Sequence, residues 1–281
     1  MLWLRNRPLR PFLTDNSALV TAWLLAIALP PFTPWWMTVL GTAFAMIFAK
    51  HLYGGLGYNP FNPAMVGYVM LLISFPAEMT VWPALASLSG HVPSFLDSLS
   101  IIFRGQPMGD LALDALSGAT PLDTIKTELT LFHTLEEIQR NPLFGIYGAK
   151  GWEWINGAFL LGGGWLVYKR IITWHIPVAV LGSLFLVSGL FFVFDSGIYT
   201  SPLFHIASGA AILGAFFIAT DPVSAATSNK GRLFYGAGIG LLIYIIRSWG
   251  GYPDGVAFSI LLMNMTVPVI DYYTQPRVFG H

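Results

Sequence analysis

Eight apolar runs of near-membrane length constrain this chain more than any other feature of its sequence. Each run is bounded by proline, glycine or charge, and they cover roughly residues 17–31, 34–53, 63–76, 152–168, 176–194, 203–220, 233–246 and 256–272. Only 10% of the residues are charged, whereas a soluble domain carries about a quarter. A chain this poor in charge cannot cover a globular surface. The sequence therefore predicts an all-α polytopic membrane protein, folded as a helix bundle that satisfies its backbone within lipid.

Charge and cysteine content exclude several kinds of function. The formal net charge of +0 leaves no basic excess to neutralise phosphates, so we expect no nucleic-acid partner. The chain has no cysteine, which excludes disulfides and thiolate-ligated iron–sulfur clusters within it. Its histidines show no metal-binding spacing, so no metal site is predicted. Any redox chemistry must come from an organic cofactor or from partners.

The cations predict an orientation in a bacterial inner membrane. With both termini in the cytoplasm, most cations outside the long polar segment fall on the cytoplasmic side, and these are Arg5, Arg7, Arg10, Lys50, Lys169, Arg170, Lys230, Arg232 and Arg277. Among the short loops only Arg247 falls on the opposite side. We expect three parts: membrane spans in 1–76, a long periplasmic segment in 77–151, and further spans in 152–281. Residues 80–88 are apolar enough to re-enter the membrane, and 124–140 predicts an amphipathic surface helix.

A weak internal repeat suggests two related halves. An apolar run from Ser17 meets Pro31, and another from Ser208 meets Pro222 at the same spacing. Each is followed by a glycine-containing span that ends in a cation and a glycine pair. Because those two cations fall on opposite predicted sides, the copies would be inverted repeats, which usually place a site at their interface. Glycines in the spans, such as 162–164, should allow close helix packing.

The long polar segment contains a turn of small residues with two hydroxyls. It reads Asp114-Ala115-Leu116-Ser117-Gly118-Ala119-Thr120 and is followed by Pro121. Glycine permits a close backbone approach, and small neighbours leave the Thr120 hydroxyl accessible. The alternative interpretation is an ordinary surface turn.

Polar residues near the span ends are further candidates. Asn59 and Asn62 lie in a stretch rich in glycine and proline, which is either a plain cytoplasmic loop or a re-entrant loop lining a polar cavity. Asp221 closes the sixth run. Arg247 and Asp254 share one short turn, where carboxylates and cations are functional candidates by default, although a plain ion pair between helices also explains them.

Four stretches together resemble one family. They are 53–68, the Asp114–Thr120 turn, Thr220-Asp221-Pro222-Val223-Ser224 and 250–258. The chain resembles the RnfD/NqrB family, which comprises the D-type subunits of the Rnf electron-transport complex and the B-type subunits of the sodium-pumping NADH:quinone oxidoreductase. This resemblance covers nearly the whole chain and implies a urea-transporter-like architecture. Family members usually have ten spans, two of them upstream of the arginine-rich stretch that begins this chain.

The resemblance also implies cofactors. A periplasmic flavin transferase would esterify Thr120 with the phosphate of FMN, and the recognition sequence would be Asp114, Ser117, Gly118 and Ala119. A second, non-covalent flavin, riboflavin, is a looser implication, and we expect Asn59, Asn62 and Asp221 to line its cavity. We further expect Arg247 to lie near the FMN, oriented by Asp254.

The function implied is electron transfer within an ion-translocating ferredoxin:NAD oxidoreductase, as one redox subunit and not a complete enzyme. The partners implied are a second covalent-FMN subunit, small membrane subunits, and cytoplasmic iron–sulfur and NADH-binding subunits. The B-type subunit of the quinone-reducing enzyme is the close alternative. A urea-type channel or solute transporter is the alternative of another class, and it would carry no covalent flavin.

Overall fold

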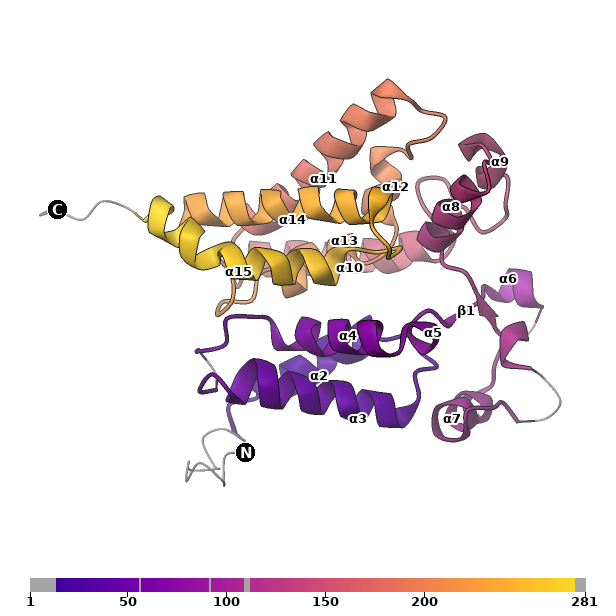
Figure 1. Ribbon diagram of the computed structural model, residues 1–281, viewed down its shortest axis with the longest axis horizontal. Helices are drawn as coiled ribbons and strands as arrows, with labels where there is room; N and C mark the ends of the chain where they lie inside the picture. The colour runs from indigo at the N-terminus through magenta and orange to yellow at the C-terminus, as the bar shows by residue number, and fades with distance from the viewer. Residues whose placement is uncertain (1–13, 56, 91, 109–111, 276–281) are drawn as a thin grey trace, which may run out of the picture. The chain divides into compact units, whose positions relative to one another are not determined.

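Helices form wherever the sequence has an apolar run. The computed structural model describes residues 14–55, 57–90, 92–108 and 112–275 (Figure 1). In order along the chain, the eight runs correspond to α2 (Ser17–Ala28), α3 (Trp35–Phe44) with the π-helical η2 (Ala45–His51), α4 (Pro63–Ser74), α10 (Trp152–Tyr168), α11 (His175–Phe194), the broken helix of α12 (Pro202–Ala207), α13 (Ala211–Leu213) and the π-helical η4 (Gly214–Ile218), then α14 (Asn229–Trp249) and α15 (Val256–Thr274). The predicted helix positions are confirmed.

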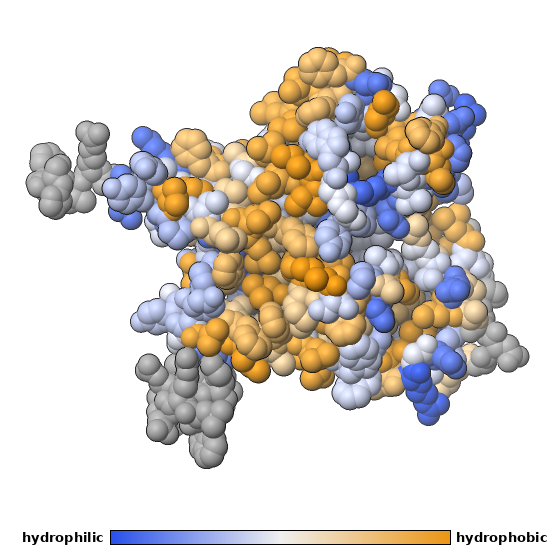
Figure 2. All heavy atoms as spheres, viewed as in Figure 1, coloured by the Kyte–Doolittle hydropathy of each residue, from blue (hydrophilic) through white to orange (hydrophobic). Residues whose placement is uncertain are grey.

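Two of the described helices, α11 and α15, are long and apolar enough to cross a membrane on their own. The helices α2 and α4 are also apolar but shorter. Figure 2 shows apolar residues covering the middle of α14 and α15, with hydrophilic residues gathered toward their ends. That distribution is typical of helices whose middle faces hydrocarbon. Arg5, Arg7, Arg10 and Arg277, which support the predicted orientation, lie outside the described residues.

Contacts divide the chain into two units, Met1–Asn59 with Pro63–Thr124, and Pro60–Asn62 with Ile125–His281. The three-part division of the sequence concerns the membrane and stays a prediction. In the first unit, α2, α3 and η2 all pack on α4. Gly41 of α3 and Gly67 of α4 bring these two helices together, since a Cβ at Gly67 would lie 2.6 Å from the Gly41 carbonyl oxygen.

The first unit continues into short elements of the polar segment. These are α5 (Pro76–Met79), β1 (Trp82–Pro83), α6 (Ala86–Ser89), α7 (Phe95–Arg104), the 3₁₀ turn η3 (Leu113–Ala115) and β2 (Ser117–Gly118). The strands β1 and β2 form one antiparallel pair. Residues 80–88 thus hold β1 and α6.

The second unit is built around α11 and α14. Gly236 and Gly240 of α14 face α11, and a Cβ at Gly236 would lie 2.9 Å from the Ile176 carbonyl oxygen. The next turn, at Gly240, is tighter still, so only glycine permits this approach. The helices η4 and α14 both pack on α15, in the way that α2 and α3 pack on α4.

The predicted surface helix over 124–140 is two helices, α8 (Pro121–Thr130) and α9 (Leu135–Gln139). Phe132, in the left-handed region at φ 64°, follows the end of α8. Thr134 then starts α9 with a reciprocal capping box, in which its hydroxyl oxygen accepts from the Glu137 N–H. The single-helix prediction overlooked this restart signal.

Candidate functional site

The turn that carries the proposed flavin motif is fixed to the first unit by a short ladder. Gly118 pairs with Trp82, Ser117 pairs with Pro83, and the Ala84 N–H donates to the Leu116 carbonyl oxygen at 2.9 Å. Leu116 is buried against Phe32 and Ile101. The backbone on either side of the buried leucine is thereby held, while Asp114 and Ala119 stay exposed.

Thr120 caps the helix that follows. Its Oγ1 accepts a hydrogen bond from the Asp123 N–H at 3.3 Å, and Pro121 occupies the first helical position. The Thr120 side chain is half-buried. Among the described residues no acceptor takes the hydroxyl hydrogen of Thr120. A reactive hydroxyl therefore sits at the N-terminus of α8, where unpaired N–H groups and the helix dipole favour an anion.

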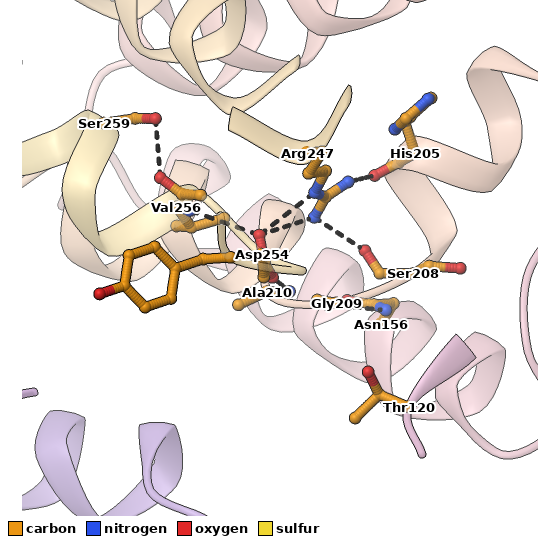
Figure 3. Close-up of polar contacts among 12 residues, drawn as sticks. Thr120, Asn156, His205, Ser208, Gly209, Ala210, Arg247, Asp254, Val256 and Ser259 are labelled. Carbon is orange, nitrogen blue, oxygen red and sulfur yellow. Dashed lines mark hydrogen bonds and ion pairs between the residues drawn. The ribbon is translucent and has the colours of Figure 1, made fainter. Parts of the chain in front are cut away.

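The sixth apolar run is a broken helix, and buried side chains satisfy the groups freed at its break (Figure 3). Residues 208–210 separate α12 from α13. Arg247 donates from Nη1 to the His205 carbonyl oxygen and from Nη2 to that of Ser208, the latter at 3.1 Å. Asn156 of α10 donates to the carbonyl oxygens of Ala207 and Gly209, at 2.8 and 3.3 Å.

Asp254 completes this arrangement, which we call the break clamp (Asn156, Arg247 and Asp254). Its Oδ2 accepts from the Ala210 N–H at 2.8 Å, and its Oδ1 lies 3.1 Å from Arg247 Nη2. The ion pair between Arg247 and Asp254 is confirmed, with only 2% of the Arg247 side chain exposed. A buried ion pair needs further hydrogen bonds to offset its desolvation, and the broken helix supplies them.

Lys126 of α8 binds the end of α14 in the same unit. Its Nζ donates to the Tyr252 carbonyl oxygen at 2.9 Å and lies 3.4 Å from that of Ile246. A cation at a helix C-terminus favours the unpaired carbonyl groups there. Sequence reasoning missed both Lys126 and Asn156. Asn156 had a usable signal, because it is a polar residue inside an apolar run.

Two residues expected to line a second flavin cavity lie in one buried polar cluster. The Asn62 N–H donates to Asn264 Oδ1 at 3.2 Å, and Asn62 Nδ2 donates to the Ile218 carbonyl oxygen at 3.4 Å. Asn264 in turn donates to the Ser224 carbonyl oxygen and to the Tyr235 hydroxyl. Asp221 accepts from the Ser224 hydroxyl at 2.8 Å.

This buried polar cluster contains Asn264, which the sequence reading did not select, at the centre of its hydrogen bonds. Asn59 is also buried but belongs to the first unit. Thr120 likewise lies in the first unit and the break clamp in the second, so each is described within its own unit.

Apolar helices, a broken helix held by buried polar side chains and glycine-mediated packing define a helical membrane protein. The chain belongs to the NQR2, RnfD, RnfE family, which it matches over residues 1–280. The family resemblance seen in the sequence is thus confirmed.

Its relatives bear one description, the D-type subunit of an ion-translocating oxidoreductase complex. The relative of that name in Aliivibrio salmonicida is 59% identical over 285 residues, covering 99% of this chain and 81% of that protein. The one in Vibrio atlanticus is 56% identical over 288 residues, covering 100% of this chain and 83% of its own. The one in Escherichia coli is 53% identical over 289 residues, with 100% and 82% covered.

Proposed function

We propose that this chain is the D-type subunit of an ion-translocating ferredoxin:NAD oxidoreductase complex of the inner membrane, and that it carries FMN covalently on Thr120. The family match and the names of the relatives support the place in a complex. The Asp114–Thr120 motif supports the flavin. Bound FMN would supply one- and two-electron transfer, and the protein would supply its position and electrostatic surroundings.

The observation that carries the flavin proposal is the capping role of Thr120. Its Oγ1 already faces the first-turn N–H groups of α8. A phosphate joined to that oxygen could take over the hydrogen bond from Asp123, and the helix dipole would favour its charge. The ladder of β1 and β2 would hold Ser117 and Gly118 in a fixed extended form for a transferase to recognise.

Loss of the Thr120 hydroxyl tests this proposal. Thr120→Val keeps the β-branched shape but removes the capping oxygen, so we expect a loss of about 0.5–2 kcal/mol in stability and no unfolding. The denatured variant should lose flavin fluorescence on a gel. Ser117→Ala is the matched control and should keep it. A Thr120→Val chain that stays fluorescent would place the attachment elsewhere.

Riboflavin is the second cofactor that we propose, held by Asn59, Asn62 and Asp221. The buried amide and carboxylate of Asn62 and Asp221 offer the donors and acceptors that a flavin ring edge needs. We expect Asn62→Leu to yield less non-covalent flavin on extraction than the wild type. Asn229→Leu, at an exposed position, is the control. Equal yields from all three chains would remove Asn62 from the site.

The rest of the proposal concerns partners and orientation. The Thr120 segment would lie in the periplasm, where a flavin transferase acts, and both termini would lie in the cytoplasm. A second covalent-FMN subunit, small membrane subunits, and iron–sulfur and NADH-binding subunits would complete the complex. The bilayer is the remaining partner, and the exposed apolar side chains of the long helices support this.

A further inference from the structure

The short helix α7 presents an apolar stripe that nothing in the first unit covers. Phe95, Leu96, Leu99 and Phe103 are 76, 58, 36 and 61% exposed. At 100° per residue these four positions fall within one third of the helix circumference. A soluble surface helix places its apolar face against the core, so exposure of a whole stripe indicates another apolar phase.

The other side of α7 attaches it to the unit. Ile101 is only 1% exposed and packs with Phe32 and Leu116. Asp97 forms a reciprocal capping box with Ser94, whose hydroxyl oxygen accepts from the Asp97 N–H at 3.1 Å. The helix is therefore anchored on one side and capped at its start. The uncovered stripe is a fixed feature of the fold.

Phe32 places α7 at one end of the apolar helices of its unit. This residue lies in the connection between α2 and α3, at the end opposite to the Asp15–Lys50 ion pair. Trp35 and Trp36 begin α3 and remain 48 and 38% exposed, and Trp36 contacts Phe75 edge-to-face at the end of α4. Exposed tryptophans at helix ends mark the level of the membrane–water boundary.

The direction of α7 fits that level. Figure 1 draws α7 almost end-on, whereas α3 and α4 lie along the plane of the picture, so α7 runs across the axes of these apolar helices. The stripe carries no charge or hydrogen-bonding group, as a docking face for a charged protein surface would need. It repeats the spacing of the exposed side chains of α2, which are Leu19, Val20, Trp23 and Ile27.

We propose that α7 is an interfacial helix, which lies in the plane of the membrane with Phe95, Leu96, Leu99 and Phe103 inserted at the boundary between lipid headgroups and acyl chains. Such helices bury their apolar face about 5–10 Å deep in the bilayer. Arg104, exposed in the last turn, is placed to pair with a lipid phosphate. The helix would fix the level of the adjoining flavin-motif turn against the membrane, because Leu116 packs on the same core.

Spin labels can test this directly, because the chain contains no cysteine. Single-cysteine variants Phe95→Cys, Leu99→Cys and Phe103→Cys would be labelled in the full-length chain reconstituted alone into phospholipid nanodiscs. Trp23→Cys on α2 serves as the lipid-exposed control, and Glu136→Cys on α9, 84% exposed, as the water-exposed control. Collision with oxygen reports lipid, and collision with a water-soluble nickel chelate reports water.

We expect the three α7 labels to collide with oxygen as the Trp23 label does, and to lose the nickel collisions seen at Glu136. Nickel collisions equal to those at Glu136 would overturn the proposal and indicate that the stripe awaits a protein partner. Labels shielded from both reagents would overturn it too, because they would show burial between copies of the chain. Variants are compared only where elution and helix content match the wild type.

Discussion

At the residue scale, Arg247 does the most within the part of the chain that the structure describes. Its guanidinium binds two carbonyl oxygens of the broken helix and one carboxylate. A planar fork of five donors can do this, whereas the ammonium group of lysine cannot match the geometry. The pairing with Asp254 follows from sequence, since both lie in one turn. The contacts with α12 do not, because they join residues about forty positions apart.

Arg247 also supplies a prediction about the flavin. We propose that its charge lies close enough to FMN to favour the reduced, more anionic form. Arg247→Leu should then lower the FMN reduction potential, and Arg247→Lys should preserve most of it because the charge remains. Both variants should lose stability, by roughly 3 kcal/mol or more for the leucine, since Asp254 and two carbonyl groups lose their donor. A potential unchanged in the folded Arg247→Leu protein would leave Arg247 only its structural role.

At the element scale, glycines decide which helices pack closely. Gly163 of α10 is buried, and a Cβ there would lie 2.7 Å from Phe216 Cβ in η4. Its neighbour Gly164 faces open space, with nothing within 4 Å of such a Cβ. The sequence predicted a role for the three-glycine run, but only the structure separates the packed glycine from the free one.

This difference gives a matched pair of variants. Gly163→Leu should overpack the contact with Phe216 and lower the free energy of unfolding by about 1–3 kcal/mol. Gly164→Leu should change it little, because the new side chain points away from the unit. Thermal unfolding in one detergent would compare the two. Equal effects would mean that α10 does not pack on η4 as described.

The capping box of α7 makes a prediction about pH. Hydrogen bonds from the hydroxyl and N–H groups of Ser94 lower the pKa of Asp97, and the Met108 N–H adds a third at 3.2 Å. Because the folded pKa is the lower one, the box stabilises α7 above the ordinary aspartate range and fails as the pH falls through the folded value. A spin label at Leu99→Cys should therefore become more mobile below about pH 4. Adding Asp97→Asn should remove that pH dependence, and a dependence that persists would assign it to another group.

At the scale of the whole molecule, the sequence predicts where helices form better than how they pack. In lipid a helix is apolar all round, so its composition reveals the element but not the face that meets a neighbour. The eight runs therefore predict the helices well. The break at residues 208–210, the partners Asn156 and Asn264, and the division of 124–140 depend on contacts distant in sequence or on local caps. Each unit contains three helices packed in the same way, while the inverted relation between the two stays a prediction.

The candidate flavin site was predicted as far as its residue and its exposure. The small-residue turn indicated Thr120, and the structure adds that this hydroxyl caps α8. The ladder with β1 was not predictable, because two-residue strands carry no periodicity and their partner lies about thirty-five residues earlier.

Peptide mass analysis of the native chain tests the central claim most directly. Cleavage after Arg104 and Lys126 releases residues 105–126, in which Ser117, Thr120 and Thr124 are the hydroxyl residues. We expect this peptide to carry the mass of one FMN phosphoester, and fragmentation to place it on Thr120. An unmodified peptide from the assembled native complex, or a flavin on Ser117 or Thr124, would contradict the attachment at Thr120.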